Sequence, residues 1–104
     1  MDEIGFRLRL TWPGEEAHDF LVLDEQANII GRIYREVATS QGRWLFFVGP
    51  GNLPRRADFH GYVDSLEEAK ARFRELWPRY REQWSEERLE EALAQQRAAW
   101  ASGN

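Results

Sequence analysis

The segment SLEEAKARFRELW (65–77) is the strongest structural signal in this sequence, because it predicts an amphipathic helix with a defined start. Ser65 and Glu68 match the S-x-x-E capping box that closes the first helical turn. Pro78 lacks a backbone N–H and restricts Trp77, so we expect a kink or a restart there. Such a helix must bury its apolar face, which is formed by Leu66, Ala69, Phe73, Leu76 and Tyr80.

The residues before this helix predict strands that could supply the surface it covers. IGFRLRLTW alternates apolar and polar residues, as a strand with one buried face does. Two β-rich runs joined by a short polar turn predict a hairpin, and Gly31 within the second indicates a bulge or a close backbone approach. HGYV (60–63) is compatible with a short fifth strand at an edge. The four predicted strands are about 4–12, 19–24, 29–35 and 43–49.

These elements predict an α+β fold, with a four-stranded, mainly antiparallel sheet covered by the 65–77 helix. A second helix is expected over about 85–100, because Glu86 and Glu87 favour a helix start. The 104 residues are expected to form one domain, 1–104, whose end frays at 101–104. A hydrophobic content of 42% supplies enough apolar material for a core.

Composition narrows the classes of function. The absence of cysteine excludes disulfides and thiolate metal sites, and it fits a reducing cytoplasm. The N-terminus lacks the basic and apolar segments of a signal peptide, and no apolar run approaches the ~20 residues that span a bilayer. We therefore expect a cytoplasmic protein without membrane association. Lys70 is the only lysine among 14 basic side chains, which is typical of a GC-rich bacterial genome.

The sequence contains no recognisable catalytic constellation. Ser65 and Ser85 are explained as helix caps, and GPGN lacks the lysine and hydroxyl of a phosphate-binding loop. His18, His60 and Asp58 have the residue types of a metal site, but isolated surface histidines show the same pattern. We predict no enzymatic activity, no cofactor and no metal.

Arginines suggest one candidate binding surface. Residues 29–56 carry several arginines against a single acid, Glu36. The element order is analogous to that of AP2 and integrase-arm domains, in which sheet residues enter the major groove of DNA. The net charge of −4 opposes this interpretation. The alternative function is therefore nucleic-acid binding through the arginines of the sheet and the following loop: Arg7, Arg9, Arg32, Arg35, Arg43, Arg55 and Arg56.

Tryptophans of the C-terminal region suggest a different surface. They lie beyond the stripe that covers the sheet, and tryptophan is enriched at binding hot spots. An isolated helix over 85–100 would be marginal, so it must pack on its own sheet, on the 65–77 helix or on another chain. The leading hypothesis is a non-catalytic protein-interaction module, with a homodimer as one form. Its predicted partner-binding residues are Trp77, Trp84, Leu89, Leu93 and Trp100.

Three stretches, DEQANIIGRIYRE, GRWLFFV and GYVDSLEEAKARFRELW, resemble a set of small uncharacterised proteobacterial proteins. The shared features are a G-R-I-Y-R strand, an aromatic-rich strand and a helix with the pattern G-Y-x-x-S-L-E-E-A-K-x-x-F. The resemblance covers roughly residues 20–77 and implies a compact domain of sheet and helix. It implies no activity, cofactor or catalytic residue, and the long acidic C-terminal helix departs from it.

Overall fold

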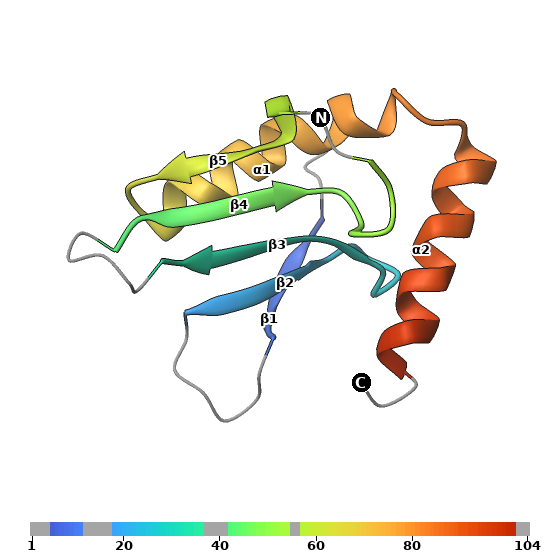
Figure 1. Cartoon of the computed structure of the whole chain (residues 1–104), viewed down its shortest axis with the longest axis horizontal. Helices are drawn as coiled ribbons and strands as arrows, with labels where there is room; N and C mark the ends of the chain where they lie inside the picture. The colour runs from blue at the N-terminus through green and yellow to red at the C-terminus, as the bar shows by residue number, and fades with distance from the viewer. Residues whose placement is uncertain (1–4, 12–17, 37–41, 55–56, 102–104) are drawn as a thin grey trace.

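The structure, a computed structural model, describes residues 5–11, 18–36, 42–54 and 57–101 (Figure 1). Strands come first in the chain and helices last. The elements in chain order are β1 (Arg7–Leu10), β2 (Asp19–Leu23), β3 (Ile29–Arg35), β4 (Trp44–Val48), the 3-10 turn η1 (Ala57–Phe59), β5 (His60–Val63), α1 (Leu66–Arg81) and α2 (Glu86–Ala101).

The strands form one antiparallel sheet in the order β1-β2-β3-β4-β5, which confirms the α+β class and the antiparallel pairing. The sheet has five strands where four were predicted, and the fifth, β5, is the short edge strand for which the sequence allowed at 60–63. Its residues pair with β4 from Trp44 opposite Val63 to Phe47 opposite His60. This pairing satisfies backbone groups of β4 that would otherwise lie at an open edge.

Gly31 has the close backbone approach that the sequence predicted. A Cβ atom at this position would overlap the Phe73 ring and the carbonyl oxygen of Phe47. The register also shifts one step away, since Val22 pairs with Gly31 and Leu23 pairs with Ile29. The strand is therefore bulged beside the glycine on which the helix rests.

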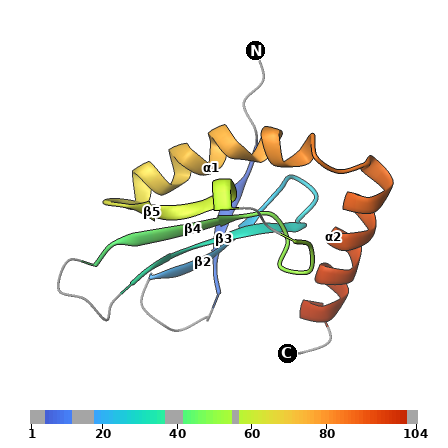
Figure 2. The same cartoon turned by 45° about the horizontal axis from the view of Figure 1, so that its top comes forward.

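Helix α1 lies across one face of the sheet, over β3, β4 and β5 (Figure 2). Ser65 caps it as expected, because its Oγ accepts a hydrogen bond from the Glu68 N–H at 3.1 Å. The Glu68 carboxylate accepts from the Ser65 hydroxyl at 3.3 Å. Phe73 packs over Gly31, and Tyr80 packs over Gly49, whose φ of 105° is in the region that favours glycine. Both rings are fully buried.

The helix extends beyond the predicted end at residue 77, and of the two outcomes predicted at Pro78, a kink or a restart, the restart does not occur. It runs through Pro78 to Arg81, and Glu82 caps it by donating its N–H to the Pro78 carbonyl at 3.2 Å. The cost of one missing ladder bond is outweighed by burial on both sides of the proline. Trp77 is 4% exposed and Tyr80 is 1% exposed, and burying large aromatic rings contributes several kcal/mol.

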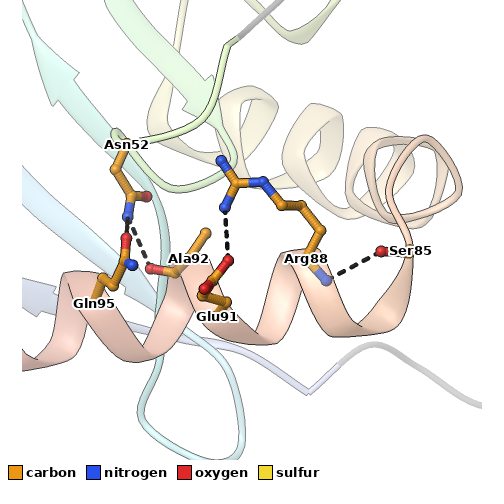
Figure 3. A network of polar contacts seen from close by, with 6 residues as sticks. All are labelled: Asn52, Ser85, Arg88, Glu91, Ala92 and Gln95. Carbon is orange, nitrogen blue, oxygen red and sulfur yellow. Dashed lines mark hydrogen bonds and ion pairs between the residues drawn. The ribbon is translucent and has the colours of Figure 1, made fainter.

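Helix α2 stands at the end of the sheet, beside β3 and the loop after β4 (Figure 1). Ser85 caps it by accepting from the Arg88 N–H at 3.1 Å. The Asn52 Nδ2 donates to the Ala92 carbonyl at 3.0 Å and to the Gln95 Oε1 at 3.4 Å (Figure 3). The helix thus packs on its own sheet at β3, the first of the three alternatives that the sequence left open.

We expect Gly31→Ala to destabilise the fold by about 1–3 kcal/mol, because overpacking between α1 and β3 forces one of them to move. Urea unfolding followed by circular dichroism measures this loss. Gly51→Ala is the matched control, since its Cβ would meet nothing closer than the Gln96 Oε1 at 3.8 Å. The control should stay within about 0.5 kcal/mol of the wild type. Equal stability of the two variants would contradict the close contact between α1 and Gly31.

Candidate partner-binding groove

A groove of about 760 Å³ lies between the end of α1, the first half of α2 and the turn from β2 to β3. Its volume falls within the range of sites that bind small molecules or short segments of chain. One continuous stretch, 77–93, and the distant turn at 24–28 therefore build one concave surface, to which Gly5 also contributes.

Four of the five predicted partner-binding residues line this groove: Trp77, Trp84, Leu89 and Leu93. Trp77, Leu89 and Leu93 also belong to the hydrophobic core, with exposures of 4%, 7% and 7%. Trp84 is half-buried and packs against that core. The fifth, Trp100, lies in α2, but its side chain lies outside the described part of the structure. The groove floor is thus the outer boundary of the core.

The aromatic side chains beneath the groove form one connected cluster around Tyr80. Trp77 stacks on Tyr80 with ring centroids 5.8 Å apart, and Trp84 lies 6.2 Å from it at a tilt. Phe59 contacts Tyr80 edge to face at 5.3 Å. Among the described residues, the Nε1 atom of Trp84 has no hydrogen-bond partner although it is buried. The position of Trp84 is therefore stabilised by ring packing at the expense of one unsatisfied donor.

The rim of the groove is acidic. Among the described residues that line it, five are carboxylates and one, Arg81, is a guanidinium. Arg81 lies over the Trp77 ring, with its Cζ 5.9 Å from the ring centroid. The carboxylates come from the β2–β3 turn, the end of α1 and the start of α2: Asp24, Glu25, Glu82, Glu86 and Glu90.

The β2–β3 turn forms one side of the groove and is held in shape by hydrogen bonds. Asp24 Oδ1 accepts from the N–H groups of Gln26 at 2.9 Å and Asn28 at 2.8 Å, and Oδ2 accepts from the Asn28 side chain at 3.0 Å. Ala27 takes a φ of 66°, which few residues other than glycine and asparagine adopt. Arg97 of α2 donates to the Asn28 side chain and so ties the turn to the helix.

The sheet face opposite α1 is a second candidate surface, which neither helix crosses (Figure 1). A row of planar groups runs over three strands on this face. The Arg32 Cζ lies 4.6 Å from the Tyr34 ring centroid, Tyr34 stacks on Phe47 at 5.9 Å, and Phe47 stacks on His60 at 5.6 Å. Asp19 accepts from Arg32, with 2.8 Å between Oδ1 and Nε, and this hydrogen bond raises the pKa of Arg32.

The predicted nucleic-acid residues are only partly brought together. Arg7 and Arg9 share the open face with Arg32, because Arg9 and Arg32 both pair with Leu21. Arg43 lies toward the same face, 6.0 Å from the Tyr62 ring centroid. Arg35 does not belong with them: it pairs with Trp44, which faces the helix side, and its Nε donates to the Gly42 carbonyl at 3.2 Å. Strand alternation separates it from Arg32. Arg55 and Arg56 lie outside the described residues.

Other chemistry finds little support in the described ranges. Within them, no three side chains of His, Cys, Asp or Glu converge as metal ligands. His18 and His60 lie on different strands or loops, and His60 is part of the aromatic row. The same part of the chain contains no helix long and apolar enough to span a membrane.

Comparisons with protein-family models, with curated proteins and with solved structures find no match to this chain. The resemblance to small proteobacterial proteins therefore stays a prediction. Function has to be argued from the two surfaces themselves.

Sequence reasoning missed the acidic rim and the aromatic row. The acids Glu86 and Glu90 were visible as helical neighbours, but their meeting with Asp24 and Glu25 depends on how α2 folds back. The row of Tyr34, Phe47 and His60 depends on the register of three strands. Both features are made by residues that are far apart in the sequence, so the local spacing of residues could not predict them.

Trp84→Phe should change the free energy of unfolding by no more than about 1 kcal/mol, because it removes a buried, unpaired N–H together with part of a ring. Trp77→Phe, in the same aromatic cluster, should cost more, about 2 kcal/mol, since Trp77 is almost fully buried. Parallel urea titrations of the two variants measure the difference. A larger loss for Trp84→Phe would mean that its indole N–H does have a partner.

Proposed function

We propose that this protein is a non-catalytic protein-interaction module whose groove receives a short segment of a partner chain. The observation that carries the proposal is the groove itself, lined by Trp77, Trp84, Leu89 and Leu93 below an acidic rim. Concave surfaces with aromatic floors and a few polar groups are typical binding sites. Tryptophan adds contact area at a low cost in conformational entropy.

A peptide segment fits the groove better than a second copy of the folded chain does. The apolar residues of α2, Leu89, Ala92 and Leu93, already pack within the chain. Among the described residues, Tyr62 is the one large apolar side chain that is exposed, at 54%. Stable homodimers bury large apolar patches. Self-association through the C-terminal helices therefore has less support than binding of an extended segment.

Selection of short random peptides on the full-length chain tests this proposal. We expect selected peptides to lose binding to Gln26→Trp, because Gln26 is exposed in the turn and a larger side chain there would fill the groove. Gln83→Trp is the matched control, since Gln83 is equally exposed and does not line the groove. Fluorescence anisotropy of labelled peptides gives the affinities. Failure to select any binder, or binders that tolerate Gln26→Trp, would overturn the proposal.

A second candidate function, binding of single-stranded nucleic acid, is favoured by the row from Arg32 to His60 on the open sheet face. Planar groups on a sheet can stack bases, while arginines contact phosphates. His60 ends the row on the edge strand β5 and is exposed there. Arg7 and Arg9 are exposed on the neighbouring strand β1.

If this candidate is correct, a labelled oligothymidine should bind at low salt and be released as salt rises. Replacing both Arg7 and Arg9 by Ala should weaken binding and lower the salt slope by about one per lost phosphate contact. Arg79→Ala removes the same kind of charge from α1, away from the sheet face, and serves as the control. Absence of binding at the lowest salt would dispose of the candidate.

A further inference from the structure

Most carboxylates of the groove form no ion pair with a described residue, a property that they share with Glu87 outside the groove. Elsewhere on the helices, Glu67 pairs with Lys70, Glu75 with Arg72 and Glu91 with Arg88. Within the described residues, no ion pair is formed by the rim residues Glu25, Glu82, Glu86 and Glu90. The fifth carboxylate, that of Asp24, accepts hydrogen bonds within the β2–β3 turn. With five carboxylates and one guanidinium, that of Arg81, the described lining of the groove has a net negative charge, and Arg97 lies beside it at Asn28.

Like charges also stand close together on this rim. Glu86 and Glu90 are four positions apart on α2, a spacing that destabilises a helix when both residues have the same charge. A cation placed between the rim carboxylates would relieve this repulsion. The potential is focused by the concave shape and by the low-dielectric aromatic floor.

The floor of the groove suits one kind of cation. Arg81 already lies over the Trp77 ring, which shows that an indole here accepts a guanidinium. A guanidinium is planar and weakly hydrated, so it can contact an indole and a carboxylate at the same time. A volume of about 760 Å³ exceeds the needs of a single ion and leaves room for adjoining residues of a peptide.

We propose that the groove binds an arginine-bearing peptide segment, with the guanidinium held between Trp84, the half-buried tryptophan of the lining, and the carboxylates of Glu86 and Glu90. This inference rests on the proposed function of the groove as a peptide site and names the chemistry of its occupant. Arg81 is a competing cation at the edge of the same site.

A short glycine–arginine peptide is the probe, and the same peptide with citrulline in place of arginine is its uncharged control. Calorimetric titration at low ionic strength should show binding of the arginine peptide, and citrulline should weaken it by about tenfold or more. The indole N–H signals of Trp77 and Trp84 should shift during an NMR titration. Arg81→Ala should strengthen binding, since it removes a like charge.

Glu86→Gln and Glu87→Gln form a matched pair, because they are adjacent in the first turn of α2 and change the net charge equally. Only Glu86 lines the groove. We expect Glu86→Gln to weaken the arginine peptide several-fold and Glu87→Gln to leave it nearly unchanged. If the two variants weaken binding equally, the attraction depends only on the net charge of the protein, and the inference is wrong.

The outcomes also separate this inference from the proposed function. If peptides selected at random bind in a manner sensitive to Gln26→Trp, yet arginine and citrulline peptides bind equally, the groove is a peptide site without a preference for guanidinium. If no peptide of either kind binds, both the inference and the proposed function fail.

Discussion

The seat of α1 on two glycines is the contact on which the rest of the structure depends. Phe73 occupies the space that a side chain at Gly31 would fill, and Tyr80 does the same at Gly49. Because the two rings are about two helical turns apart on one face of α1, they fix both the position and the direction of the helix on the sheet. The end of α1 is thereby placed next to the β2–β3 turn, where the groove forms.

The turn between α1 and α2 places the end of the first helix and the start of the second around the groove. Trp77, Tyr80 and Trp84 form one aromatic cluster that spans the turn, so the helix continues through Pro78 until these rings are buried. Helix α2 is then tied to the loop after β4 through Asn52 and to the β2–β3 turn through Arg97. A groove between elements that are bonded on both flanks needs little rearrangement to receive a ligand, which lowers the entropic cost of binding.

Local patterns predicted the elements well and their meeting points poorly. The capping box at Ser65, the stripe from Ala69 to Tyr80 and the close approach at Gly31 were all legible, because each depends on neighbours in the sequence or on one missing side chain. The end of α1 was misplaced because burial of Tyr80 outweighs the local effect of Pro78. The placement of Arg35 apart from Arg32 depends on strand alternation and register. The groove could not be foreseen, since it needs the path of α2 relative to the turn.

The net charge of −4 conceals two surfaces of opposite character. The groove gathers carboxylates from three elements, whereas the open sheet face carries Arg7, Arg9 and Arg32, the last partly neutralised by Asp19. A basic peptide is attracted to the first surface and repelled by the second, and a nucleic acid experiences the reverse. The whole-chain charge of −4 adds a longer-ranged preference for the peptide at low ionic strength, whereas at 0.1 M salt charges more than about 10 Å apart are largely screened and the local surface dominates. The sign of each surface thus sets which charged partner it would attract: a cationic segment at the groove and an anionic one at the arginine face.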